Sequence, residues 1–208
     1  FIFLSYNISL FQWRNSLICN CRTMVKSFTV FGVQETLPVN MSQYEDAFTT
    51  AGDSMQLTSD LFDTDYENKT TWKISADMND IKVFYKDRED GRYLSSKVKM
   101  NISAKDFTNQ LWNNMHKDQE WNPNMKLSKR IRKITESVDI VQIQSKDNLL
   151  VSSREFILVR CMKQIGDTFY MASRSLEKSE IQETKGVIRW LVGRQSWKWP
   201  HSERTSTL

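Results

Sequence analysis

Arg160 is the residue whose position most suggests a binding role. It stands in an apolar run, residues 156–162, where Phe156, Leu158 and Met162 share its face if the run is a β-strand. A cation buried there alone would cost several kcal/mol, so it needs an acidic side chain, a ligand or water. An apolar wall with one polar anchor suits the binding of an apolar molecule. The alternative is that these side chains simply pack as core.

Residue types that carry catalysis or bind metals are sparse. The two histidines are His116 and His201, and neither is close in sequence to Cys161. No glycine-rich phosphate loop, metal-ligand spacing or nucleophile elbow occurs. We therefore expect no enzyme activity, no metal site and no cofactor. The catalytic alternative is a hydrolase that uses Cys161 or His116.

The composition favours one globular domain. The 208 residues include nine methionines and 12% aromatic residues, and methionine suits both apolar binding walls and irregular core gaps. The net charge of +4 permits attraction to a membrane surface, but nucleic-acid binding needs a more clustered excess. Three cysteines give no disulfide framework, which fits a cytoplasmic setting. No apolar run reaches the roughly 20 residues of a membrane-spanning helix. We also expect the protein to be a monomer.

The run that contains Arg160 is predicted to be the first strand of a hairpin. Both of its faces are mostly apolar, which indicates a strand covered on two sides. A turn is predicted at residues 164–167, because Gly166 can adopt a positive φ. In the returning strand, residues 168–173, Phe169 and Met171 share one face.

Helices are predicted on either side of a group of strands. Ser42 and Glu45 form a capping box, followed by apolar residues at helical spacing from Phe48 onward. Ser103 is predicted to cap a second helix, with Asp106 in its first turn.

Alternation of apolar and polar residues predicts further strands. These strands are residues 72–78, 81–86, 94–102 and 138–144. Asp90-Gly91 is a hairpin signal, whereas residues 25–40 show little periodicity and are expected to be a linker. This order of helices and strands indicates an α+β fold with one curved antiparallel sheet.

A basic run follows the second helix. Residues 126–133 contain five basic residues in eight. We interpret the run as a solvated strand edge, because charged side chains are mostly exposed. The alternative is a membrane-facing surface, where each cation would add about 1 kcal/mol of attraction to anionic lipid.

Several motifs resemble those of one family, the START (StAR-related lipid transfer) domain. They are residues 120–124 (EWNPN), 153–156 (SREF), 159–161 (VRC), 172–175 (ASRS) and 185–189 (KGVIR). The resemblance runs in consistent order from about Tyr44 to Arg189 and is nearest to the sterol-binding steroidogenic acute regulatory subgroup. It implies a helix-grip fold, in which a curved sheet grips a long C-terminal helix with a lipid tunnel between them.

The resemblance also implies a function, lipid binding and intracellular transfer of one lipid, most simply a sterol. It implies a cytoplasmic protein in peripheral contact with membranes. Tunnel-lining positions match Asn122, Met125, Arg160 and Met171. Strand alternation adds others on the same faces: Phe156, Leu158, Met162 and Phe169. Arg160 would orient a ligand hydroxyl, directly or through water.

One position departs from the sterol-binding pattern. The relatives carry an acidic residue on the strand beside the arginine, and the matching positions near Val141 and Ile143 are uncharged. Asp139 shares their strand face and is a candidate polar partner of Arg160. The departure leaves a phospholipid, a carotenoid or a fatty acid open as the ligand.

The resemblance predicts three segments. Residues 1–40 are expected to be a leader and linker, with Met24 the better start of the protein. Residues 41–189 are the START-like domain, and residues 190–208 are a divergent tail without the closing helix. A domain truncated in this way suggests an alternative function, an interaction module that does not transport lipid and binds a partner through its exposed concave face.

Overall fold

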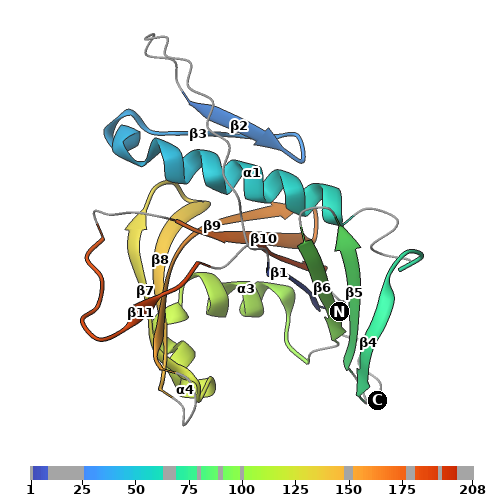
Figure 1. Cartoon of the computed structure of the whole chain (residues 1–208). Helices are drawn as coiled ribbons and strands as arrows, with labels where there is room; N and C mark the ends of the chain where they lie inside the picture. The colour runs from blue at the N-terminus through green and yellow to red at the C-terminus, as the bar shows by residue number, and fades with distance from the viewer. Residues whose placement is uncertain are drawn as a thin grey trace.

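The computed structural model of the chain describes residues 2–8, 26–62, 69–78, 81–88, 91–98, 101–147, 152–176, 181–191 and 194–200. Its main element is a 10-stranded curved sheet in the order β4-β5-β6-β1-β12-β10-β9-β8-β7 (Figure 1). The neighbours on this path are antiparallel, and β11 pairs in parallel with β9. The predicted α+β fold with a curved antiparallel sheet is confirmed.

The elements have the following bounds. The strands of the sheet are β1 (Ile2–Ile8), β4 (Lys73–Met78), β5 (Ile81–Arg88), β6 (Gly91–Val98), β7 (Met125–Lys133), β8 (Val138–Ser145), β9 (Arg154–Ile165), β10 (Thr168–Ser175), β11 (Ile188–Arg189) and β12 (Arg194–Pro200). A separate hairpin has strands β2 (Ser27–Val30) and β3 (Val33–Thr36). The helices are η1 (Val39–Tyr44), α1 (Glu45–Leu61), α3 (Ala104–Trp112), η2 (Met115–Lys117) and α4 (Asp118–Trp121).

The predicted strands are present with small differences in length. The strand predicted over residues 94–102 ends at Val98, and Ile102 lies in a bend. Asp90, half of the predicted turn signal, lies outside the described residues. The hairpin that contains Arg160 is β9 and β10, with Ile165 opposite Thr168 and Gly166 at a φ of 55° in the turn.

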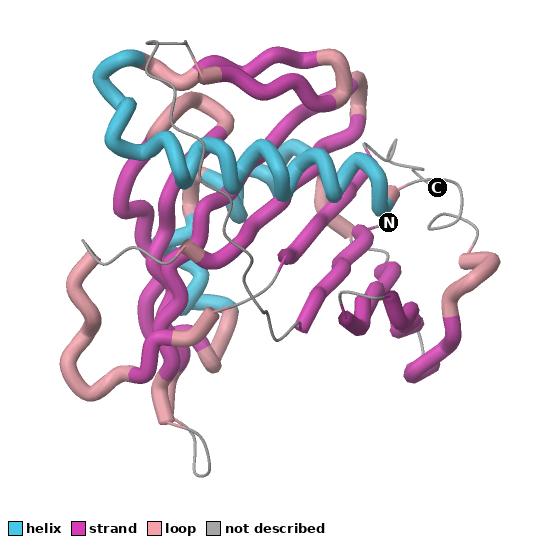
Figure 2. The backbone as a smooth tube through the Cα atoms, turned by 45° about the horizontal axis from the view of Figure 1, so that its top comes forward, coloured by secondary structure: helices cyan, strands magenta, loops and turns pink. Residues whose placement is uncertain are grey.

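Helix α1 covers one face of β8, β9 and β10. Its buried Phe48, Ala51 and Met55 pack in one core cluster with Ile157 and Val159 of β9. Figure 2 shows the long helix α1 lying across these strands. This burial explains why alternate residues of β9 are apolar on the face away from Arg160.

Helix α3 lies against the opposite face of the same hairpin (Figure 1). Ser103 caps it as predicted, because its hydroxyl oxygen accepts a hydrogen bond from the Asp106 N–H at 3.0 Å. Trp112 is buried in one cluster with Phe169 and Met171 of β10. Strand β9 is therefore covered on both faces, as its sequence predicted.

The expectation of a linker over residues 25–40 is wrong. Residues 27–36 form the hairpin β2–β3, whose Phe28 packs on Phe48 of α1 with ring centroids 4.9 Å apart. The turn places Phe31 at a φ of 53°, an uncommon conformation for a residue other than glycine. Each strand has only four residues, so the alternation of apolar and polar residues is too short to predict a hairpin from the sequence.

A buried ion pair fastens the hairpin to the sheet. Glu35 of β3 pairs with Lys163 of β9 and accepts a hydrogen bond from the Ser137 hydroxyl at 2.7 Å. Burial alone would raise the pKa of Glu35, but hydrogen bonds from Lys163, Thr135 and Ser137 outweigh burial and hold this pKa below its ordinary value. The carboxylate is thus ionised and supports the packing of β3 on the sheet.

The predicted capping box at Ser42 is also wrong. Residues 39–44 form the 3₁₀ helix η1, and α1 begins at Glu45. The Ser42 backbone carbonyl, rather than its hydroxyl, accepts from the Glu45 N–H. A continuous turn into α1 therefore takes the place of a side-chain cap.

Two segments expected to lie outside the domain are strands of the sheet. Ile2–Ile8 forms β1 between β6 and β12, and Arg194–Pro200 forms β12 between β1 and β10. Trp197 and Trp199 alternate with polar residues in the sequence, a pattern that suits a strand. The predicted boundaries at residues 40 and 189 stay predictions. Met24 and His201, named in the sequence predictions, lie outside the described residues, as do Cys19 and Cys21, the other two of the three cysteines.

A short strand extends the sheet beside the start of β9. Arg189 of β11 donates to the Glu155 carboxylate through Nε at 3.0 Å and Nη2 at 2.6 Å. The same carboxylate accepts from Gln142 of β8 and from Thr184. This network holds residues 181–191 against the sheet.

The packing of the β2–β3 hairpin on α1 can be tested at Gly52. A Cβ added there would lie 2.8 Å from ring atoms of Phe28, so Gly52→Ala should lower the free energy of unfolding. We expect a loss of about 1–3 kcal/mol from overpacking, although alanine is the better helix former. Urea denaturation measures it, with Thr49→Ala on the exposed side of α1 as the control. A Gly52→Ala variant more stable than the wild type would contradict the packing of the hairpin.

Candidate functional site

The structure brings six of the predicted ligand residues together on one surface, which we call the inner face. It is the α3 side of the hairpin and consists of Phe156, Leu158, Arg160 and Met162 of β9 with Phe169 and Met171 of β10. Met162 and Met171 are cross-strand partners. Leu158 and Phe156 pack with Met115 and Val141, and the residues nearer the hairpin turn pack with Trp112.

Asn122 and Met125 lie elsewhere. Met125 begins the edge strand β7, which β8 separates from β9. The Asn122 side chain accepts from the Asn124 N–H at 3.1 Å and so stabilises the turn before β7. A ligand role for these two residues stays a prediction.

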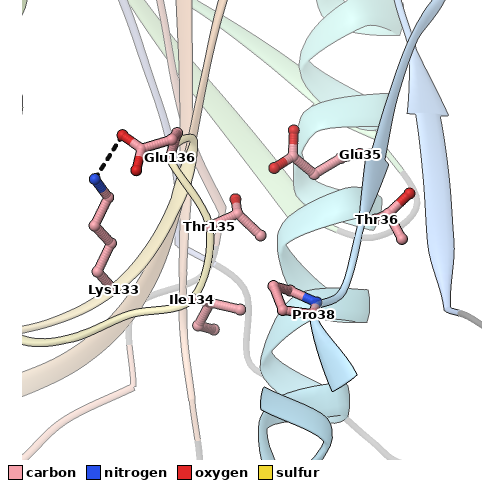
Figure 3. Close-up of a pocket in the computed structure, with 7 residues that line it drawn as sticks. All are labelled: Glu35, Thr36, Pro38, Lys133, Ile134, Thr135 and Glu136. Carbon is pink, nitrogen blue, oxygen red and sulfur yellow. Dashed lines mark hydrogen bonds and ion pairs between the residues drawn. The ribbon is translucent and has the colours of Figure 1, made fainter. Parts of the chain in front are cut away.

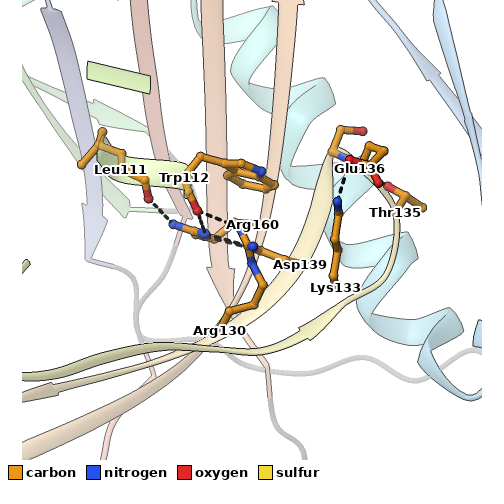
Figure 4. Close-up of polar contacts among 9 residues, drawn as sticks. Leu111, Trp112, Arg130, Lys133, Thr135, Glu136, Asp139 and Arg160 are labelled. Atoms are coloured by element: carbon orange, nitrogen blue, oxygen red, sulfur yellow. Dashed lines mark hydrogen bonds and ion pairs between the residues drawn. The ribbon is translucent and has the colours of Figure 1, made fainter. Parts of the chain in front are cut away.

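Arg160 is buried and paired with Asp139. The two residues are directly opposite each other on β9 and β8, with exposures of 5% and 0%. Arg160 donates from Nε to Oδ1 at 2.9 Å and from Nη2 to Oδ2 at 2.7 Å, which is a bidentate pair (Figure 4). Asp139, the candidate partner from the sequence, therefore supplies the acidic group, and protein atoms rather than solvent surround the cation.

Arg130 is a third member that the sequence analysis missed. Its Nε donates to Asp139 Oδ2 at 2.7 Å, and its Nη2 donates to the Trp112 carbonyl at 2.7 Å. Arg130 belongs to the basic run, which favoured a solvent-facing residue. The signal that would have found it is alternation with the buried Ser128 on the same strand face.

Both arginines also bind the end of α3. Arg160 donates from Nη1 to the Leu111 carbonyl at 2.8 Å and from Nη2 to the Trp112 carbonyl at 3.4 Å. Its guanidinium lies 4.5 Å from the centroid of the Trp112 ring. The last carbonyls of a helix lack partners within the helix, so the arginines satisfy groups that would otherwise be unpaired. The network of Arg130, Asp139 and Arg160 thus fastens α3 over the inner face.

A second carboxyl lies near the network. Asp118 is buried at the start of α4, and its Oδ2 accepts from the Ser128 hydroxyl at 3.0 Å. Its Oδ1 is buried without a partner in the described part of the chain. Burial raises the pKa of Asp118 above its ordinary value.

The basic run occupies the edge strand β7. Lys126, Lys129, Arg132 and Lys133 are exposed, whereas Arg130 turns inward. Exposed charges on an edge strand also discourage pairing with another chain. Contact of this strand with a membrane stays a prediction.

A pocket of about 470 Å³ lies between β3 and the β7–β8 turn (Figure 3). Its lining residues are Glu35, Thr36, Pro38, Lys133, Ile134, Thr135 and Glu136. Both carboxylates are paired, Glu35 with Lys163 and Glu136 with Lys133. The lining includes none of the inner-face residues and carries two carboxylates, so this pocket is separate from the inner face.

The residues considered for hydrolysis are poorly placed for it. Cys161 is buried on the α1 side of β9, and burial raises the pKa of its thiol to about 12. The thiol is therefore neutral near pH 7, and thiolate is the reactive form. His116 is exposed in η2 on the opposite side of the sheet, where Met115 packs on Leu158.

Among the described helices, none is long and apolar enough to cross a bilayer.

The pairing of Arg160 can be tested through Asp139. Asp139→Asn should lower the free energy of unfolding by about 3–5 kcal/mol, because it leaves buried cationic groups without their carboxylate. Urea denaturation measures the loss, and Asp53→Asn on the exposed side of α1 is the control, with an expected change within about 0.5 kcal/mol. A double variant, Asp139→Leu with Arg160→Leu, should recover part of the stability. Equal stability of Asp139→Asn and the wild type would contradict the role assigned to the pair.

Comparison with known proteins finds relatives that are named steroidogenic acute regulatory and regulatory-like proteins. The chain is 30% identical over 166 residues to steroidogenic acute regulatory-like protein 1 of Caenorhabditis elegans, which covers 78% of this chain and 64% of that protein. It is 31% identical over 126 residues to the human mitochondrial steroidogenic acute regulatory protein, which covers 59% of this chain and 44% of that one. The chain therefore spans less than two thirds of the length of these relatives.

Solved structures share the fold at low identity. Human StAR-related lipid transfer protein 5 has a TM-score of 0.56 at 14% identity, and the match covers 79% of this chain and 86% of that one. Human STARD10 has a TM-score of 0.52 at 11% identity, with coverages of 70% and 69%. The START domain model matches residues 53–195, which begins and ends later than the predicted span. The resemblance seen in the sequence is confirmed, and the chain belongs to the START domain family, whose members bind and transfer lipids.

Proposed function

We propose that the chain encloses one lipid, of sterol size, against the inner face and carries it between membranes. The observation that supports this most is the desolvated Arg160–Asp139 pair in the middle of an otherwise apolar wall. A ligand that buries roughly 300 Å² there would gain on the order of 7 kcal/mol before ordering costs. Apolar burial would supply the affinity, and the polar network would orient the ligand.

The proposal requires α3 to move. Phe169 and Met171 are buried beneath this helix, with Phe107, Leu111 and Met162 packed around them. A ligand must take the place of these helix side chains, and its polar end must replace the Leu111 and Trp112 carbonyls as acceptors for the arginines. The described structure is then the closed form, and release of α3 is the step that admits lipid.

The sterol assignment rests on relatives and on size. The relatives are named steroidogenic acute regulatory and regulatory-like proteins, and the human one is named as mitochondrial. For this chain a cytoplasmic location with peripheral contact at membrane surfaces is part of the proposal and rests on the cysteine content of the sequence. The exposed cations of β7, among them Lys126 and Lys129, would support such contact. Recognition of a sterol ring system as the apolar part of the ligand is part of the proposal.

The interaction-module alternative has less support. It needs an exposed concave face, and α3 covers that face in the described structure. A partner that bound the inner face would have to displace the same helix as a lipid does.

Release of α3 can be tested at Phe107. Phe107→Ala removes packing from a half-buried residue, at about 1–2 kcal/mol, and should raise the open fraction and the loading rate roughly 5–30-fold. Uptake of a fluorescent sterol from vesicles by the full chain measures the rate, after mass spectrometry of extracted lipid establishes what the purified protein holds.

Lys105→Ala, at an exposed position of the same helix, is the control and should load at the wild-type rate. A destabilised Phe107→Ala variant with unchanged loading would show that α3 does not limit entry. A well-folded chain that neither retains nor takes up sterol or phospholipid would overturn the proposed function.

A further inference from the structure

The charges of the inner face identify a class of ligand, provided that the proposed lipid site is correct. We propose that the site takes a lipid whose polar end is an oxyanion, a carboxylate, sulfate or phosphate, in preference to a neutral hydroxyl. Arg130 is the residue that sets this preference.

The network carries more positive than negative charge. Asp139 is its one carboxylate, and it is bound by the guanidinium groups of Arg160 and Arg130. Two cations against one anion leave a net charge of +1 beside an apolar wall. Uncompensated charge in such a place is costly, and an anionic ligand group would offset it, whereas a neutral hydroxyl would not.

The nearby carboxyl of Asp118 is bound to Ser128 and not to either arginine of the network. Its Oδ2 is directed to the Ser128 hydroxyl, and its Oδ1 is buried without a partner in the described part of the chain. Burial raises the pKa of Asp118 above its ordinary value. Among the described residues Asp118 forms no ion pair with Arg130 or Arg160, so both guanidinium groups keep donors available to a ligand.

Arg130 also has unused donors. It donates through Nε and Nη2, and its Nη1 has no hydrogen-bond partner among the described residues. Its side chain is 30% exposed, compared with 6% for that of Arg160, so part of it is accessible from outside the network. A guanidinium that presents parallel N–H groups matches the geometry of an oxyanion.

The end of α3 shows what the ligand would replace. When α3 leaves, the arginines lose their bonds to the Leu111 and Trp112 carbonyls. An oxyanion offers several lone pairs in one group and can accept from both arginines at once. A single hydroxyl oxygen would leave part of this donor set unpaired, which is unfavourable.

A matched pair of ligands tests the preference. Cholesteryl sulfate and cholesterol share one ring system and differ in the polar end, so their affinities are compared by competition with a fluorescent sterol. The wild-type chain should bind the sulfate about tenfold or more tightly than cholesterol, as expected for hydrogen bonds to charged groups. Arg130→Gln should remove most of this difference, because it should lower the affinity for the sulfate much more than the affinity for cholesterol.

Arg132→Gln is the matched control, because Arg132 is an exposed arginine of the same strand outside the network. Arg130→Lys keeps the charge with fewer donors and should give an intermediate preference, which also guards against a misfolded Gln variant. Raising the salt concentration should weaken binding of the sulfate alone.

The outcomes separate the two proposals. Equal affinity of the wild-type chain for both lipids would overturn the oxyanion preference and leave the lipid site intact. Failure of both lipids to bind would overturn both proposals. Displacement of cholesteryl sulfate by sodium sulfate at a similar concentration would show a site for the free ion and overturn the lipid assignment. A preference that survives Arg130→Gln would overturn the role of Arg130.

Discussion

The buried carboxylate of Asp139 is the group on which the rest of the site depends. It lies opposite Arg160 in the register of β8 and β9 and also binds Arg130 of β7, so one side chain joins three strands. The same arginines hold the carbonyl end of α3. Because each of these charged groups would be costly to bury alone, the edge of the sheet and the covering helix have to assemble together.

The two faces of β9 have different surroundings: one packs on α1, and the other is the inner face beneath α3. On the α1 side, Ile157, Val159 and Cys161 pack in an apolar core, with the ion-paired Glu155 and Lys163 at either end of the same strand face. On the α3 side, the contacts are apolar around a polar centre, where in the proposed function ligand oxygens would take the place of helix carbonyls as acceptors. In that proposal, one face of the hairpin is a permanent core and the other has an exchangeable cover.

Local patterns predicted the β9–β10 hairpin, because β9 is a long apolar run and Gly166 marks the turn that follows it. They also placed Asp139 on the correct face of its strand. Periodicity does not determine which residues of neighbouring strands lie opposite each other, so the direct pairing of Asp139 with Arg160 could be seen only in the structure. Arg130 was missed because a run of basic residues usually lies on the solvent-exposed side of a strand. The register of β7 shifts between Arg130 and Arg132, so the two side chains differ in exposure, and the sequence carries no clear signal for this shift. The β2–β3 hairpin was missed because its strands are short and its turn uses Phe31 at a positive φ.

The central claim is that a lipid occupies the inner face beneath α3, and photochemical labelling tests it most directly. A photoreactive sterol bound to the full chain would be cross-linked and the modified residues mapped by mass spectrometry of proteolytic peptides. The account predicts labels on Phe156, Leu158, Met162, Phe169 or Met171 and on the facing residues of α3. Labels confined to exposed apolar residues such as Ile188, Trp190 and Leu191, with none on the inner face, would contradict it.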